Sequence, residues 1–155
     1  MKIKQETSIS GGVQNEEAKQ NVRNILRDDI QIHTGSSASG NRSLSQPIQD
    51  AFQSNGHRTE VSPQSLPNKR VDVYHGNIPI EIDIGSKRTA VLTNLLTLQE
   101  EYSQGYIDES ILIVPENKED WGGKSWFKTR EWAKKEISKY ESVFDIPIWL
   151  VGVSP

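Results

Sequence analysis

Three carboxylates, Asp72, Glu81 and Asp83, lie in the segment RVDVYHGNIPIEIDIGSK, residues 70–87, which otherwise has the pattern of two β-strands. Carboxylate oxygens are the ligands that hard cations such as Mg²⁺ and Mn²⁺ prefer. The chain contains no cysteine, so any metal must bind to oxygen or histidine ligands. Mg²⁺ held in this way can bind a phosphate oxygen and activate a water molecule. The segment therefore predicts a cation site. The alternative is an exposed strand face with ordinary surface acids.

A hairpin is predicted in the same segment, because Gly76 and Asn77 suit a two-residue turn with positive φ angles. The turn sets a register in which residue 75 faces 78 and Asp72 faces Glu81. Opposed side chains have Cβ atoms about 4.5–5.5 Å apart, so these two acids should repel one another. Alternation predicts one apolar face, made by Val71, Val73, Ile78, Ile80, Ile82 and Ile84, and an opposite face with Asp72, Tyr74, Pro79, Glu81 and Asp83.

The periodicity of the rest of the chain predicts an α/β fold in which a mixed central sheet is flanked by helices. Strands are expected at 71–75, 78–84, 110–114 and 146–153, and helices at 15–27, 45–54, about 89–103 and about 126–141. The last helix would begin after Ser125 as its N-cap and bury Trp126, Ala133, Ile137 and Tyr140.

Length and composition predict one domain spanning residues 1–155, with a helical and loop extension at 1–40 and the core at 70–153. The net charge of −3 argues against indiscriminate nucleic-acid binding. Residues 118–139 nevertheless carry seven Lys or Arg against four acids, so positive charge is local. No run approaches the roughly 18–20 apolar residues of a membrane span, and the N-terminus has no apolar signal-peptide centre. A cytoplasmic protein is expected.

The stretch VDVYHGNIPIEIDIGSK resembles the active-site segment of the BglII and BstYI type II restriction endonucleases, a branch of the PD-(D/E)XK nuclease superfamily. Upstream, SQPIQDAFQSNGHR is similar to their short helix, and downstream VFDIPIWLVGVSP is similar to the strand that follows their last core helix. The resemblance covers residues 40–155. The first 40 residues match poorly.

The resemblance implies roles for particular residues. Asp72 and Glu81 match the two metal-binding acids. Asp83 stands where most of the superfamily has lysine, and where relatives in this branch have glutamine or glutamate; it would bind the metal or orient the attacking water. Contacts to the recognition sequence are implied for Ser86 and Ser125, although Ser125 has an equal claim as a helix cap. Weaker candidates for phosphate contact are Lys87, Lys124, Lys128, Asn41 and Arg42; a salt bridge is an equal alternative for Lys87.

The activity implied is that of a type II site-specific DNA endonuclease using Mg²⁺, with Mn²⁺ as a substitute. The resemblance further implies a homodimer acting on a palindrome with a GATC core in double-stranded DNA, and a cognate DNA methyltransferase in the host. Two alternatives stay open. One is a repair or recombination nuclease of the same superfamily. The other is a non-catalytic DNA-binding protein with a nuclease fold, for which Asp83 and the negative net charge speak.

Overall fold

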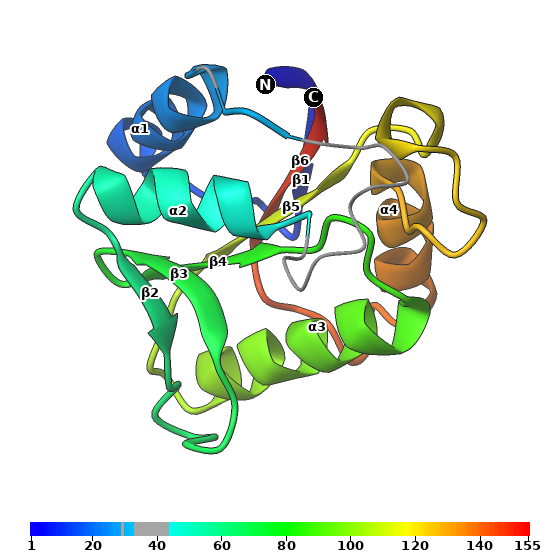
Figure 1. The fold of residues 1–155 in the computed structure, drawn as a ribbon. Coiled ribbons are helices and arrows are strands. Elements are labelled where there is room, and N and C mark those ends of the chain that lie inside the picture. Colours follow the sequence, from blue (N-terminus) through cyan, green and yellow to red (C-terminus); the bar gives the residue numbers. More distant parts are fainter. Residues whose placement is uncertain (29, 33–43) are drawn as a thin grey trace.

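The computed structural model describes residues 1–28, 30–32 and 44–155, and Figure 1 shows their arrangement. Six strands and four α-helices follow the order β1 (Lys2–Ile9), α1 (Glu16–Arg27), α2 (Gln46–Ser54), β2 (Arg58–Val61), β3 (Val71–His75), β4 (Ile78–Ile82), α3 (Arg88–Ser103), β5 (Ser110–Pro115), α4 (Arg130–Lys139) and β6 (Ile148–Ser154), with a short 3₁₀ helix, η1 (Glu119–Trp121), before α4. No helix in the described ranges is both long and apolar enough to cross a membrane.

The strands form one sheet in the order β1-β6-β5-β4-β3-β2. Parallel pairs join β4 to β5 and β5 to β6, whereas the remaining neighbours are antiparallel. Every residue of β4, β5 and β6 is buried, as expected for strands covered on both faces. The predicted mixed α/β sheet flanked by helices is confirmed.

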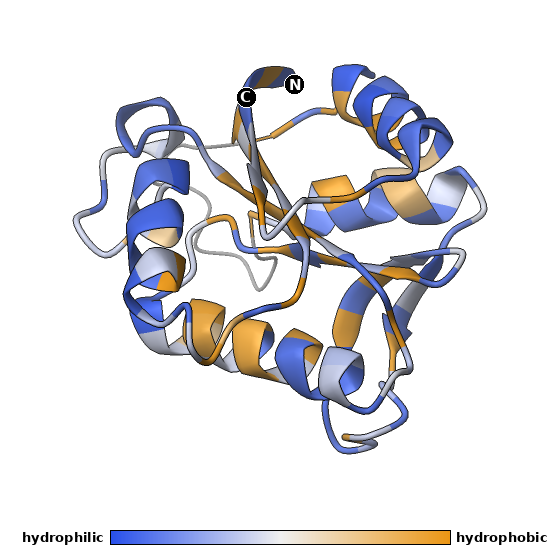
Figure 2. Ribbon diagram, turned by 180° about the vertical axis from the view of Figure 1, so that it is seen from behind, coloured by the Kyte–Doolittle hydropathy of each residue, from blue (hydrophilic) through white to orange (hydrophobic). Residues whose placement is uncertain are grey.

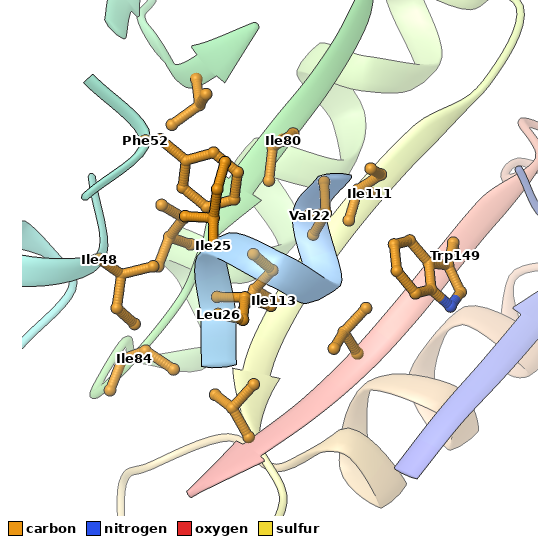
Figure 3. Packing of buried hydrophobic residues seen from close by; sticks show 14 of the residues in the cluster. Val22, Ile25, Leu26, Ile48, Phe52, Ile80, Ile84, Ile111, Ile113 and Trp149 are labelled. Atoms are coloured by element: carbon orange, nitrogen blue, oxygen red, sulfur yellow. The ribbon is translucent and has the colours of Figure 1, made fainter. Parts of the chain in front are cut away.

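The sheet separates two apolar cores. The core beneath α1 and α2 includes Val22, Phe52 and Trp149 (Figure 3). The core beneath α3 and α4 includes Leu95, Ile137 and Leu150. Hydrophobic residues accordingly concentrate on the strands, whereas α1 and α4 are mostly hydrophilic and contribute only a few buried apolar residues each (Figure 2). Burial against both faces gives the central strands the rigidity that a precisely spaced site requires.

The β3–β4 hairpin has the predicted register, with His75 opposite Ile78, Tyr74 opposite Pro79 and Val73 opposite Ile80. The predicted apolar face is correct for Val73, for its three members on β4 and for Ile84 just beyond it, but Val71 packs in the opposite core. Regular pairing of β3 with β4 ends at Val73, so strict alternation does not extend to Val71.

The last helix begins later than predicted, at Arg130, and its N-cap is Thr129, whose hydroxyl accepts a hydrogen bond from the Trp132 N–H at 3.4 Å. Ser125 is therefore not the cap. Trp126 lies in the preceding loop and is 47% exposed, and Tyr140, just beyond the helix, is 41% exposed. The predicted apolar face is thus wrong for these two aromatic residues, because residues 124–127 form a turn closed by the Phe127 N–H and the Lys124 carbonyl at 3.1 Å and the helix spans only Arg130–Lys139.

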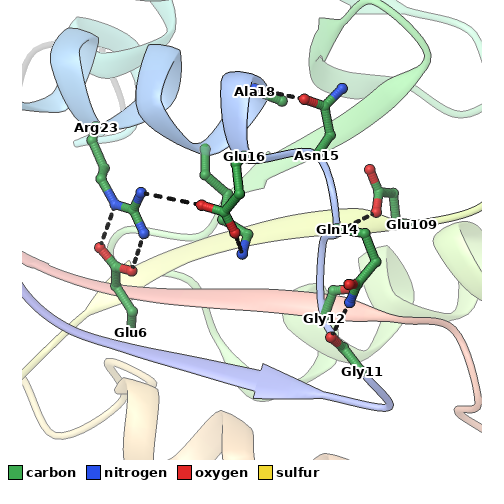
Figure 4. A network of polar contacts seen from close by, with 10 residues as sticks. Glu6, Gly11, Gly12, Gln14, Asn15, Glu16, Ala18, Arg23 and Glu109 are labelled. Carbon is green, nitrogen blue, oxygen red and sulfur yellow. Dashed lines mark hydrogen bonds and ion pairs between the residues drawn. The ribbon is translucent and has the colours of Figure 1, made fainter.

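Strand β1 was not predicted, and it places a β-strand in the N-terminal region expected to hold only helix and loop. It is joined to α1 by polar contacts (Figure 4). Arg23 of α1 donates two hydrogen bonds to the Glu6 carboxylate at 2.9 and 2.7 Å, and its guanidinium lies 5.1 Å from the Trp149 ring centroid. Asn15 caps α1 by accepting the Ala18 N–H at 2.9 Å. These contacts fix α1 over the β1–β6 edge.

The Glu6–Arg23 pair makes stability depend on acidity. The Arg23 guanidinium lowers the pKa of Glu6. The pair therefore stabilises the fold above the ordinary glutamate pKa, and this stabilisation is lost as pH falls through the lowered folded-state pKa of Glu6. We expect Glu6→Gln to reduce the free energy of unfolding by about 0.5–1 kcal/mol at pH 7, and to make stability fall less between pH 5 and 3. Urea unfolding at several pH values measures this. Glu16→Gln, at a carboxylate that is 72% exposed and lies 4.0 Å from the same guanidinium, is the control and should change little.

Candidate active site

The three predicted carboxylates come together at one end of the β3–β4 hairpin. Asp72 lies on β3, Glu81 on β4, and Asp83 directly follows β4. The hairpin register, continued by one residue, places Asp72 opposite Glu81, and the β2–β3 register places Glu60 opposite Asp72. A row of three acids thus crosses three adjacent strands. Asp72, Asp83 and Glu60 line an open cleft with Gln49, Ser86 and Asn94.

Asp72 is held by the backbone of the neighbouring strand, because its Oδ2 accepts the Ile82 N–H at 2.7 Å. Burial raises the pKa of Asp72 to about 6, against the opposing effect of that hydrogen bond, and the charges of Asp83 and Glu60 raise it further. The carboxylate therefore has a fixed position and a surplus of negative charge around it.

Glu81 is the most electrostatically strained of the three acids. Its side chain is only 1% exposed, and its Oε1 has no hydrogen-bond partner among the described residues. Burial raises the pKa of Glu81 well above its ordinary value, and the charges of Asp72 and Asp83 raise it further. A buried carboxylate oxygen without a donor is costly unless a cation neutralises it. The alternative of exposed surface acids is therefore wrong for Glu81.

Asp83 is also buried, but its carboxylate is turned toward α3. Asn94 of α3 donates to Oδ1 and Oδ2 at 3.1 and 3.3 Å. Burial raises the pKa of Asp83, and hydrogen bonds from Ser86 and Asn94 oppose that effect. Ser86, a predicted base contact, thus also contacts this acid. In the described part of the chain, no three His, Asp or Glu side chains converge around one metal position as they stand.

Sequence reasoning missed several polar residues of the cleft, among them Gln49, Glu60 and Asn94. Gln49 of α2 donates its Nε2 to Glu60 Oε1 at 2.6 Å and to the Asp72 carbonyl at 3.2 Å. Glu60 has φ 53°, a left-handed conformation rare for a side chain of this kind. No local sequence signal identifies Glu60 or Asn94 as part of the cleft. The β2–β3 pairing brings Glu60 to the cleft, and the packing of α3 brings Asn94. Ser45 stands at the predicted N-cap position of α2, but its hydroxyl makes no capping bond; it donates to the Ile82 carbonyl and accepts the Ile84 N–H at 3.2 Å.

The predicted DNA contacts lie on two loops that touch. Lys124, Ser125 and Lys128 lie between η1 and α4, and the Lys124 ammonium is 5.8 Å from the exposed Trp126 ring. Buried Phe127 of this loop packs against Gly85, where a Cβ atom would lie 3.2 Å from the ring. Ser86 and exposed Lys87 follow Gly85 directly. Asn41 and Arg42, the other predicted contacts, lie outside the described residues.

The family profile described as restriction endonuclease BglII/BglIII matches residues 9–153. The chain belongs to this family. It is accordingly a type II restriction endonuclease, and the resemblance inferred from residues 40–155 is confirmed. Enzymes of this kind generally use divalent metal ions. A search of curated proteins found no match.

Solved structures agree on the fold of this BglII-family chain. The structure of BglII complexed with a DNA 16-mer matches with a TM-score of 0.76 at 17% identity, covering 98% of this chain and 76% of that one. Free BglII matches with a TM-score of 0.69 at 16% identity, covering 100% and 80%. At this identity the likeness establishes the fold, and residue roles must be argued from the site itself.

The site fits a hard divalent cation on its own chemistry. All donors in the row are carboxylate oxygens, the set that Mg²⁺ and Mn²⁺ prefer. A bound cation would pair with the Glu81 Oε1, which has no partner among the described residues, and would reduce the repulsion among the three acids Asp72, Glu81 and Asp83. Asp72 and Glu81 are the residues best placed to hold such an ion. Asp83 would join them only after turning from Asn94.

Proposed function

We propose that this restriction endonuclease hydrolyses phosphodiester bonds of double-stranded DNA in an Mg²⁺-dependent reaction, with Mn²⁺ as a substitute, at a catalytic centre formed by Asp72, Glu81 and Asp83. The observation that carries the proposal is the buried, unpartnered oxygen of Glu81 between two further acids beside an open cleft. Such an arrangement is unfavourable by itself and becomes favourable when a cation is bound.

The three acids have different tasks at this centre. Asp72 and Glu81 hold the ion, and the Ile82 N–H keeps Asp72 in place for it. When bound, Mg²⁺ supplies positive charge to the scissile phosphate and makes a bound water more acidic. Asp83, fixed by Asn94 and Ser86, presents its remaining acceptor capacity toward the cleft and orients a water molecule there. Glu60 lines the outer rim.

We expect Mg²⁺ to stabilise the protein more at pH 8 than at pH 5. Folding raises the pKa of Asp72 to about 6 and raises the pKa of Glu81 well above its ordinary value. Each group therefore holds its proton to higher pH in the folded state than in the unfolded state. The stability that comes from this proton binding is lost as pH rises through the folded-state pKa values. Mg²⁺ offsets the repulsion between the ionised carboxylates, so it stabilises the fold only at a pH where the acids are ionised. Thermal melting at both pH values, without Mg²⁺ and at Mg²⁺ concentrations that rise in tenfold steps, measures the shift in melting temperature that the ion causes. Equal shifts, or an undiminished shift in Asp72→Asn, would contradict it.

Double-stranded DNA as substrate is supported by the BglII complex with a DNA 16-mer, a protein of the same fold, and by the Lys124–Lys128 loop resting on Gly85 beside the cleft. Ser86 and Ser125 are the proposed base contacts; Lys87, Lys124, Lys128, Asn41 and Arg42 are the proposed phosphate contacts. A homodimer on a palindrome with a GATC core completes the proposal, because a two-fold enzyme suits a two-fold site. A cytoplasmic location and a cognate methyltransferase follow from that role.

The proposed phosphate contacts of Lys124 and Lys128 can be tested separately from cleavage. The double variant Lys124→Ala/Lys128→Ala should weaken DNA binding at all sequences and reduce the slope of log K against log salt by about 1–2, since each phosphate contact contributes about 0.9. Fluorescence anisotropy of a labelled duplex at several salt concentrations measures both quantities. Lys135→Ala, at an exposed position on α4 paired with Glu131, is the control and should leave the slope unchanged.

The test of the function is incubation of unmethylated plasmid with the purified protein and Mg²⁺, beside Asp72→Ala. Discrete fragments that the variant does not produce support the proposal, and sequencing of their ends gives the site, for which GATC is the expected core. Uniform degradation or attack on ends would instead favour a repair nuclease.

A second candidate, a non-catalytic DNA-binding protein, is favoured by one observation: an aspartate, turned toward Asn94, stands where most of the superfamily has lysine. DNA binding with no cleavage under Mg²⁺ or Mn²⁺ would support it.

A further inference from the structure

Two histidines face each other across β2 and β3, away from the acidic cleft. His57 directly precedes β2 and His75 ends β3, and the register of Arg58 opposite Tyr74 makes them the next cross-strand pair. Their Nδ1 atoms are 3.3 Å apart, and their ring centroids are 4.8 Å apart. The pair plays no part in the proposed catalytic centre.

The orientation of the His57 ring is fixed by a neighbour on α1. Nε2 of His57 lies 3.0 Å from Asn21 Oδ1. Because an amide oxygen only accepts, Nε2 must carry the proton, and the lone pair of Nδ1 then points toward His75. The Phe52 ring holds His57 from another side, edge-on at 5.7 Å. A histidine whose outer N–H is held by an acceptor and whose other nitrogen is free has the arrangement typical of a metal ligand.

Both histidines favour the neutral form that a metal requires. Burial lowers the pKa of His57, and the charge of His75 lowers it further. Burial also lowers the pKa of His75, with Glu17 opposing that effect. At neutral pH one Nδ1–H donates to the other Nδ1, so the two rings share a single proton that an ion can replace.

We propose that His57 and His75 form a binding site for a borderline transition-metal ion such as Zn²⁺, held through both Nδ1 atoms with water in the remaining positions. Two nitrogen ligands at about 2.0–2.1 Å from a tetrahedral ion lie about 3.3–3.4 Å apart, and the Nδ1 atoms already have this separation. Imidazole selects such ions over Mg²⁺, so the site differs in chemistry from the acidic cleft.

The ion would link β2 to β3 outside the cleft, at the far end of the strand pair that carries Glu60 and Asp72. Glu60 lies three residues after His57 and Asp72 three residues before His75. A link at the His pair therefore fixes the register that places Glu60 opposite Asp72. Zn²⁺ binding at the two histidines needs neither DNA nor the acids, so the site is independent of the proposed nuclease chemistry.

Isothermal titration of tag-free protein with Zn²⁺, in excess Mg²⁺ to occupy the carboxylates, tests the proposal. We expect one Zn²⁺ per chain for the wild type, and at least about tenfold weaker binding for His57→Gln and for His75→Gln. His33→Gln, which removes the third histidine of the chain, and Asp72→Asn should bind as the wild type does. Thermal melting without Zn²⁺ establishes that each variant is folded.

Asn21→Ala provides a second measurement that spares both ligands. It should weaken Zn²⁺ binding by about tenfold, the lower end of the effect of removing a group that orients a ligand. No Zn²⁺ binding by the wild type would overturn the proposal. Binding that survives His57→Gln but is lost in Asp72→Asn would overturn it too, because the ion would then lie on the acids, and so would loss in His33→Gln.

Discussion

Glu81→Gln should abolish DNA cleavage and at the same time stabilise the metal-free protein. The substitution keeps the size of the side chain and removes a buried carboxyl group whose pKa is raised well above its ordinary value and whose Oε1 has no partner in the described part of the chain. Because keeping Glu81 protonated or ionising it beside Asp72 and Asp83 both cost folded-state stability at pH 8, Gln should raise the free energy of unfolding by about 1–3 kcal/mol without metal. Loss of a charged ligand should lower the cleavage rate by about 10³-fold or more.

Glu101→Gln is the matched control for this effect. Glu101 is also only 1% exposed, but its carboxylate accepts the N–H groups of Gln64, at 3.1 Å, and Ser65, at 2.6 Å. Neutralising it should destabilise the fold, because charge-assisted hydrogen bonds are lost. Plasmid cleavage and urea unfolding of both variants measure the contrast. Destabilisation by Glu81→Gln would contradict the prediction, because the Glu81 charge would then be compensated in the metal-free state.

The largest loss of stability is expected from Gly152→Ala on β6. A Cβ atom there would clash with Glu116 Oε2 and would lie 3.0 Å from Arg130 Cδ. Glu116 and Arg130 form a mostly buried ion pair, with Arg130 Nε 2.7 Å from Glu116 Oε2, and Arg130 also donates to Thr7 and Gln5 of β1. Displacing Glu116 should therefore cost about 3–5 kcal/mol, the effect of breaking a buried pair.

Chemical denaturation of Gly152→Ala, beside Gly105→Ala, measures this cost. Gly105 has open space around its Cβ position but φ +74°, so its substitution should cost only about 1–2 kcal/mol of backbone strain. A Gly152 variant as stable as the Gly105 variant would indicate that Glu116 moves aside without losing Arg130.

The hairpin was predictable because its signals are local. A Gly-Asn turn between two alternating segments sets the register, and the register brings Asp72 to Glu81. Strands β1 and β2 were not predictable in the same way. Lys, Gln and Glu dominate β1, which is half exposed, and its strand state comes from pairing with β6 at the far end of the chain. Such pairing overrides local propensity.

The acids of the site were predictable as a set, but their environment was not. Alternation identifies Asp72, Glu81 and Asp83, whereas the almost complete burial of Glu81 depends on tertiary packing around β4. The turn of Asp83 toward Asn94 depends on packing between segments eleven residues apart. Thr129 rather than Ser125 caps the helix, because residues 124–127 form a turn closed by the Phe127 N–H and the Lys124 carbonyl, and α4 begins only after this turn.

The contact of Phe127 with Gly85 has a mechanical consequence. Gly85 adopts φ +80°, and a Cβ atom there would lie 3.2 Å from the Phe127 ring, so the ring packs directly against the backbone of the other loop. If Lys124 and Ser125 contact DNA as proposed, movement of their loop on binding should be transmitted through Phe127 to Gly85 and to the adjoining segment that carries Asp83 and Ser86. Discrimination between target sequences would then affect the rate of the chemical step as well as binding.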